Sequence, residues 1–412
     1  MVTRKTPLIV LFLFSIGLAS CNKAGVAPGK GQDLVLSPVE QQEVAADNAF
    51  TLKLFKNLDS ANTTANVNLF ASPLSVSFAL GMTSNGSNGA TLTAMQKATS
   101  FAGFSLAQQN SYYNNMITNL PKLDPTTTLN IANSIWYRQG FDVLPQFLQT
   151  NSNYYHAEVQ ALNFNNPSSV LTINNWVNKE TNGKIPTIIN SISSLDLMYL
   201  VNAIYFKSGW KEKFDASKTS KLPFYVTDNS PIQADFMDGD VDYKRYDDNT
   251  VHVFELPYAN DKYSMVILMP AAGTSVHQLA QQIDSSKWKT WMAGLTTDKS
   301  DLKLPKFQFS YGTNLNGALG SLGMGIAFSD DADFSLINPT AKLHISAVIH
   351  KAFVAVDESG TTAAAATVVA ITATAPANPP PTVIDHPFIF AIREISSGLI
   401  LFTGTVSNPV SQ

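Results

Sequence analysis

The order of the hydrophobic patterns along the chain constrains its fold more than any other sequence feature. Ser37 and Glu40 form a capping-box pattern with Pro38 at the first helical position, and apolar residues follow at helical spacing. A second helix is predicted after Ser72, and a third ends near Asn182. Helical patterns therefore dominate the first half of the chain.

The second half instead contains short apolar runs of β type. These runs cover residues 200–206, 251–256, 265–269, 388–392 and 399–402, and turn residues bound several of them. We found no repeat with a period of 20 to 50 residues. This division predicts an α+β fold.

The composition narrows the classes of partner. Of the 412 residues, 45% are hydrophobic and 14% are charged, so the chain can bury a large core. The formal net charge is −4, and the basic residues form no run longer than a pair such as Lys244-Arg245. A nucleic acid or an acidic polysaccharide is therefore not expected to be a partner.

The amino terminus has the pattern of a targeting segment. Arg4 and Lys5 precede an apolar run over residues 8–18, and Leu18-Ala19-Ser20-Cys21 resembles the bacterial lipobox. The resemblance implies cleavage before Cys21 after its thiol has been diacylated. We therefore expect a lipoprotein signal peptide over residues 1–20, and a flexible tether with the start of the first helix over residues 21–43. The alternative is a membrane-spanning or core helix, for which a dozen apolar residues are few.

This interpretation places the protein on a bacterial membrane, facing the periplasm or the cell surface. Because Cys21 is the only cysteine, the chain has no intrachain disulfide and no cysteine metal cluster.

Motifs of enzymatic catalysis are absent from the sequence. It contains no HExxH, GxSxG, GxxxxGK[ST] or GxGxxG pattern, and its six histidines lack metal-ligand spacing. His344 and His350 are six residues apart, and the alternation between them predicts ordinary strand positions rather than a ligand pair. We expect neither an enzyme nor a cofactor or metal site.

One segment lacks the usual features of a surface linker. Residues 361–375 contain no charge, no Pro and no Gly, and their side chains are small at first and then increasingly β-branched. Such a segment could enter a sheet. Considered alone, its composition favours a buried strand or a low-complexity Ala/Thr linker.

Several motifs resemble those of the serpin family, in family order from about residue 44 to residue 409. They are NLFASPLS (68–75), WVN (176–178), TNGKI (181–185), LVNAIYFK (200–207) with Trp210, ELPY (255–258), LPKF (304–307), LGM (322–324), HKA (350–352), HPF (386–388) and FTG (402–404).

The resemblance implies one domain over residues 44–412, with about nine helices around three β-sheets and an exposed reactive-centre loop over about residues 358–381. It also implies suicide inhibition of a serine endopeptidase by a monomer. The peptidase cleaves the loop and forms a covalent acyl complex, which is trapped when the freed loop inserts into the largest sheet. A non-inhibitory binding lipoprotein, cut only as a substrate, is the alternative.

The resemblance also assigns parts of the loop. Inserted residues must be small enough to pass between strands, and alternate side chains then face the core. The hinge is predicted to comprise Glu358, Gly360, Thr361, Thr362, Ala363, Ala364, Ala365, Ala366 and Thr367. Thr362 departs from the pattern, because glutamate is common at its position.

Family spacing places the reactive bond at Thr374-Ala375, with Ala373-Thr374 as the alternative. The residues before this bond include no Lys, Arg or aromatic residue. We therefore expect an elastase-like or subtilisin-like target with a small primary pocket, or a papain-like one.

Two sets of residues are expected to support insertion, again because they resemble family positions. Ser72, Ser75, Asn202 and His350 match the shutter beneath the opening sheet. Trp210 and Lys306, with Glu358, match the breach where insertion begins. Residues 101–120 contain no Lys or Arg, so activation by a glycosaminoglycan is not expected.

Overall fold

The computed structural model describes residues 1–2, 31–62, 66–227, 230–298, 300–361 and 381–411. The predicted lipid site Cys21, hinge residues 362–367 and the predicted reactive bond Thr374-Ala375 lie outside these residues.

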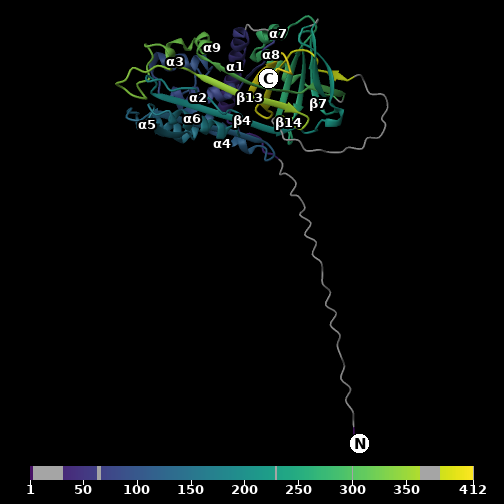
Figure 1. Cartoon of the computed structure of the whole chain (residues 1–412), viewed down its shortest axis with the longest axis horizontal. Coiled ribbons are helices and arrows are strands. Elements are labelled where there is room, and N and C mark those ends of the chain that lie inside the picture. The colour runs from purple at the N-terminus through teal and green to yellow at the C-terminus, as the bar shows by residue number, and fades with distance from the viewer. Residues whose placement is uncertain (3–30, 63–65, 228–229, 299, 362–380, 412) are drawn as a thin grey trace.

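Nine α-helices form in the described part of the chain (Figure 1). They are α1 (Pro38–Ala61), α2 (Pro73–Ser84), α3 (Gly89–Ala98), α4 (Leu106–Asn119), α5 (Pro145–Tyr155), α6 (Ser168–Glu180), α7 (Val276–Gln282), α8 (Ser285–Ala293) and α9 (Asn316–Leu319). None of these helices is long and apolar enough to cross a bilayer.

Three sheets complete the fold. The seven-stranded sheet has the order β1 (Leu69–Ala71), β17 (Ile400–Val406), β16 (Phe388–Glu394), β9 (Tyr263–Pro270), β8 (Val251–Pro257), β7 (Tyr243–Asp247) and β10 (Thr296–Asp298). The four-stranded sheet has the order β15 (Thr382–Val383), β11 (Asp301–Pro305), β6 (Pro231–Asp240) and β5 (Ser220–Tyr225). The six-stranded sheet has the order β12 (Phe307–Asn314), β13 (Ile349–Asp357), β14 (Gly360–Thr361), β4 (Met198–Gly209), β2 (Thr128–Arg138) and β3 (Glu158–Leu162). The predicted α+β architecture is confirmed.

The predicted helix starts are confirmed by their caps. The Ser37 hydroxyl accepts from the amide of Glu40, whose carboxylate accepts in turn from the amide of Ser37. Ser72 caps α2 by accepting from the amide of Ser75. The third predicted helix is α6, and the chain leaves it through Asn182 and Gly183, both at positive φ.

The predicted β runs correspond to β4, β8, β9, β16 and β17. The prediction for His344 is wrong, because β13 begins only at Ile349. The segment before β13 bonds elsewhere: the amide of Ile345 donates to the carbonyl of Ala327, and the amide of Val348 to the side chain of Asn316. These partners replace a strand ladder.

Aromatic side chains join the seven-stranded and six-stranded sheets. Phe70 of β1 stacks on Phe390 and Phe402, at centroid separations of 5.6 and 5.4 Å. Its edge contacts Phe309 of β12. A second cluster, around Trp136 and Trp176, packs α6 onto β2. The six-stranded sheet is thereby supported on both sides.

Candidate functional site

The candidate site is the opening between β4 and β13. Within the described residues these strands are joined only through the two-residue strand β14, which pairs with β13 on one side and β4 on the other (Figure 1). Beyond β14 lies a narrow cleft between the two strands. Its walls include Ile204, Tyr205 and Phe206 of β4 and Ala352, Phe353 and Val354 of β13.

The strands β4 and β13 face each other across this cleft with backbone edges that are not paired with each other. β4 pairs with β2 on its other side, and β13 with β12, so each strand turns its remaining backbone edge toward the cleft. Strands in a sheet lie about 4.8 Å apart. A strand that continued from β14 into the cleft would therefore pair with both neighbours.

The segment after α6 covers part of this cleft. Thr181, Lys184 and Ile185 contribute to its lining. The Lys184 ammonium lies 4.8 Å from the centre of the Phe353 ring, and the Lys351 ammonium donates to the carbonyl of Thr187. An entering strand must displace or pass beneath these contacts.

Gly360 fits a position that no other residue could occupy without strain. Its φ is +144°, and a Cβ there would lie 2.1 Å from the carbonyl oxygen of Ser208 and 2.7 Å from the Cα of Gly209. Both obstructing atoms belong to the backbone of β4, which cannot rotate away. The predicted hinge glycine thus permits the close approach of β14 to β4.

Thr361 lies at the entrance of the cleft. It is 2% exposed, and its hydroxyl shares a hydrogen bond with the hydroxyl of Tyr258. The Tyr258 ring stacks on Trp210 at a centroid separation of 4.7 Å and an interplanar angle of 5°. Thr361 therefore faces inward, against a rigid aromatic pair.

The residues expected at the breach come together. The Lys306 ammonium contacts both carboxylate oxygens of Glu358 at 3.0 and 2.9 Å, and Thr219 donates to one of them. Partial burial alone would raise the pKa of Glu358, but the hydrogen bonds from Thr219 and Lys306 outweigh it and hold the pKa below its usual value. Trp210 donates its indole N–H to the carbonyl of Asp357. The turn before β14 is thus fixed at several points.

Three of the four residues expected at the shutter form one cluster. His350 Nε2 accepts from the amide of Ser72 at 3.1 Å, so this ring nitrogen carries no proton. The Ser72 hydroxyl donates to the carbonyl of Leu401 and accepts from the amide of Ser75. Burial lowers the pKa of His350 to about 4.

Asn202 does not join this cluster. Its side-chain amide donates to the carbonyl of Ala132 and to the side chain of Asn133, both on β2, and its Oδ1 is buried without a hydrogen-bond partner. Asn202 therefore ties β4 to β2 rather than to the shutter.

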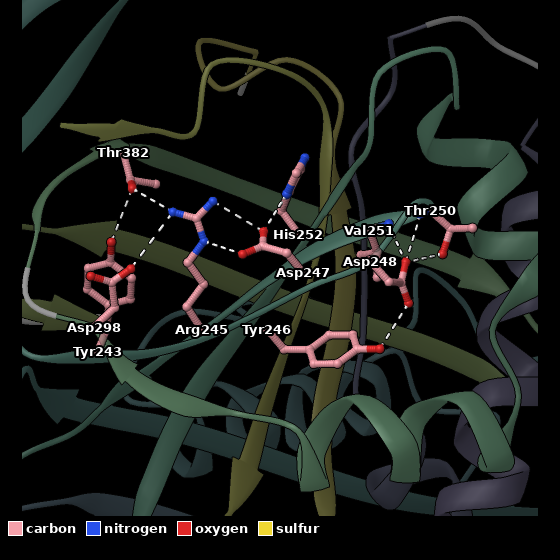
Figure 2. Close-up of polar contacts among 10 residues, drawn as sticks. All are labelled: Tyr243, Arg245, Tyr246, Asp247, Asp248, Thr250, Val251, His252, Asp298 and Thr382. Carbon is pink, nitrogen blue, oxygen red and sulfur yellow. Dashed lines mark hydrogen bonds and ion pairs between the residues drawn. The ribbon is translucent and has the colours of Figure 1, made fainter. Parts of the chain in front are cut away.

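The far end of the loop is anchored in the four-stranded sheet. The Thr382 hydroxyl in β15 accepts from Tyr243 Oη at 3.1 Å and from Arg245 Nη1 at 3.3 Å (Figure 2). Asp247 holds the Arg245 guanidinium at 2.6 Å and also contacts His252 (Figure 2). The loop is therefore fastened both at β14 and at β15.

Sequence analysis missed Tyr258, Thr219, Tyr243 and Arg245. Tyr258 ends the ELPY motif, which indicated its strand but not its contact with Thr361. The other three have no local signal, because their partners lie more than a hundred residues away along the chain. No group of His, Cys, Asp or Glu that could hold a metal occurs in the described part of the chain.

Comparisons with known proteins agree with this geometry. The family model described as Serpin (serine protease inhibitor) matches residues 45–409. The leukocyte elastase inhibitor of Bos taurus is 35% identical over 382 residues, covering 90% of this chain and all of the relative. Tengpin, a thermophilic serpin solved in its native state, superposes with a TM-score of 0.81 at 33% identity over 92% of this chain and 97% of tengpin. Human thyroxine-binding globulin, solved in complex with thyroxine, superposes with a TM-score of 0.80 at 28% identity over 90% of this chain and the whole globulin. The chain belongs to the serpins.

Proposed function

We propose that this serpin is a suicide inhibitor of endopeptidases with small primary pockets. The observation that carries the proposal is the cleft between β4 and β13, with β14 already paired at its entrance. In this proposal β14 is the first part of an inserted strand, and cleavage of the loop would allow the insertion to continue.

The chemistry is supplied by the target peptidase. Its nucleophile attacks the carbonyl carbon of the reactive bond, Thr374-Ala375, and the amine of Ala375 leaves with a proton. The peptidase is then held as an ester, or a thioester, on Thr374. The segment from Thr362 to Thr374 is now free at one end, and its entry into the cleft would carry the peptidase away from the loop's original position before water can cleave the acyl bond.

The residues before the bond define the class of target. Ile371-Thr372-Ala373-Thr374 offers a small side chain with no charge to the primary pocket. An elastase-like or subtilisin-like enzyme would accept these residues in its substrate pockets, and a papain-like enzyme is a further candidate. The relatives named leukocyte elastase inhibitors support the same class.

We further propose that the protein acts from a membrane. The lipobox-like Leu18-Ala19-Ser20-Cys21 supports diacylation of Cys21 and attachment to a bacterial membrane, facing the periplasm or the cell surface. The parent should partition with membranes, and Cys21→Ala should be unprocessed or soluble. Equal soluble fractions for both forms would exclude the anchor.

The decisive test of inhibition is incubation of the purified protein with a pancreatic-type elastase, followed by a denaturing gel. Inhibition predicts a band at the summed mass of peptidase and inhibitor, formed in step with loss of elastase activity. A variant carrying Thr374→Arg should shift this band toward trypsin-like enzymes.

The second candidate function is that of a non-inhibitory binding protein, and the structural similarity to thyroxine-binding globulin is the observation that favours it. That function predicts cleavage without a covalent band. It also predicts an unchanged melting temperature after cleavage, whereas insertion of a strand with two-sided pairing should raise it strongly.

A further inference from the structure

Two acidic side chains lie in the interior of the helical region. Glu43 and Asp47, one turn apart on α1, are each 1% exposed. Asp47 accepts hydrogen bonds from the hydroxyls of Tyr112 and Tyr113 of α4 at 2.8 and 3.3 Å. Glu43 Oε1 is buried with no hydrogen-bond partner.

The described segments that surround these carboxyls supply no positive charge. The segments α2, α4, α5 and β17, which pack around this part of the fold, contain no Lys, Arg or His. The titratable groups they present are tyrosines, Tyr112 and Tyr113 of α4 and Tyr155 of α5, and Glu40 of α1 adds a further negative charge.

The remaining neighbours of α1 meet it elsewhere. Lys53 of α1 bonds Ser100, and His277 of α7 pairs with Asp59 in the last turn of α1. The lysines of α8, Lys287 and Lys289, belong to a helix that also contacts α1. The short elements β1, α9 and the turn after it carry no titratable side chain.

Burial without a countercharge makes ionisation unfavourable. It raises the pKa of both Glu43 and Asp47 to about 7, with Glu40 and Asp47 adding repulsion in the case of Glu43. Both carboxyls are therefore neutral in mildly acidic solution, and they ionise above neutrality inside a closed protein interior.

The bonds of Asp47 cross between two parts of the molecule. On one side, α5 leads into β3, and the carbonyl of Tyr155 accepts from Asn133 of β2, which accepts in turn from Asn202 of β4. Tyr155 also donates its hydroxyl to Asn110 of α4. Helices α4 and α5 are thus tied to the strands β4, β2 and β3.

On the other side, α1 is tied to the seven-stranded sheet. The side chain of Asn48 donates to the carbonyl of Gly398 and accepts from the amide of Ile400 at the start of β17. When a strand enters between β4 and β13, the group containing β4, β2, β3, α4 and α5 must move relative to the rest. The contact between Asp47 and the two tyrosines lies on this boundary.

We propose that Glu43, Asp47, Tyr112 and Tyr113 form a proton-dependent latch across the boundary at which the six-stranded sheet opens. When both acids are neutral, packing α4 against α1 buries no charge, so the latch holds. With both ionised, the two carboxylates repel each other and gain hydration when α4 moves away from α1, so the sheet opens more readily. The inference that the six-stranded sheet opens rests on the proposed function, but the latch can be tested without a peptidase.

The test measures amide hydrogen exchange on the intact protein, comparing the parent with the double variant Glu43→Gln, Asp47→Asn at equal pH. These substitutions keep the shape and remove the ionisation. At pH 8, the amides of β2 and β4 should exchange about tenfold or more faster in the parent than in the variant. The difference should shrink as the pH falls and be small at about pH 4, near the ordinary pKa values of these acids, because the opened protein then gains little from ionising them.

The control variant is Asp331→Asn, which removes an exposed carboxylate and should match the parent at both pH values. Equal exchange of β2 and β4 in parent and double variant at pH 8 would overturn the proposal. So would an acceleration of the same size in β16 and β17, since it would mean that the acids affect global stability without acting on the opening. Neither result would bear on whether the chain inhibits a peptidase.

Discussion

The most direct test of the site concerns Gly360, since the structure shows what a single added methyl group would meet. The nearest atoms to a Cβ at this position are the carbonyl oxygen of Ser208 at 2.1 Å, the Cα of Gly209 at 2.7 Å and the carbonyl carbon of Ser208 at 3.0 Å. All belong to the backbone of β4. Gly360→Ala therefore cannot be accommodated by a rotamer change, and β14 or β4 must move.

The cost can be compared with what holds β14 in place. The φ of +144° alone costs a residue with a Cβ about 1–3 kcal/mol, and relief of the clash adds to it. The backbone bonds of β14 to its neighbours contribute about 1 kcal/mol each. The two sums are similar, so we expect β14 to leave its place. If the barrier to insertion rises by about 2–3 kcal/mol, insertion slows about 30- to 150-fold.

The assay is the ratio of covalent complex to cleaved chain on a denaturing gel, after complete reaction with an elastase-like enzyme. Slower insertion allows deacylation to win, so Gly360→Ala should yield mostly cleaved chain. The matched control is Gly103→Ala, because Gly103 has a φ of +107° but no atom within 4 Å of the position that a Cβ would take. It should keep the parent's ratio. If Gly360→Ala formed as much complex as the parent, the hinge would not enter along β14 and the reasoning would be refuted.

Three further predictions follow from the same geometry. Thr361→Arg buries an unpaired charge against Tyr258, so cleavage should persist while the covalent complex is lost; persistence of the complex on the same gel would contradict this. Because burial lowers the pKa of His350 to about 4 from 6.5, the folded state binds fewer protons than the unfolded state between these values. The free energy of unfolding should thus fall by about 1.4 kcal/mol per pH unit as the pH drops through this window, and urea titrations of His350→Asn should show that contribution missing. Thr382→Val removes the acceptor of Tyr243 and Arg245 and loosens the far end of the loop, so the intact chain should lose inhibitory activity about fivefold faster in warm storage; an unchanged half-life would show that these bonds do not restrain the loop.

Local signals in the sequence were sufficient for elements whose caps and periodicity agree. The Ser37 capping box and the apolar runs of β8, β9 and β16 depend on neighbours a few residues away. Strand β2 was missed because its alternation is interrupted by Asn130 and Asn133. Asn133 is buried only because Tyr155 and Asn202 satisfy its side chain, and those partners cannot be inferred from spacing.

The same distinction applies to the site. Gly360, Glu358 and Trp210 were identified by resemblance, yet the contacts that explain them involve Thr219 and Tyr258, which come from distant parts of the chain. Asn202 was grouped with the shutter by resemblance, and the structure pairs it with β2 instead. Resemblance indicated which positions matter, and packing determined what each of them contacts.

The two ends of the reactive loop are constrained by different partners, and this separates what can vary from what cannot. At the hinge, Gly360 must clear the backbone of β4 and Thr361 must fit beside Tyr258, so the fold itself limits which side chains are acceptable. Near Thr374, the fold makes no such demand in the proposed mechanism, and only the pocket of the peptidase selects the side chain. Substitutions near Thr374 should therefore change which enzyme is trapped, whereas substitutions at the hinge should change whether any enzyme is trapped. A serpin with this arrangement can acquire a new target peptidase through a few substitutions near residue 374, while the hinge, the breach and the cleft stay the same.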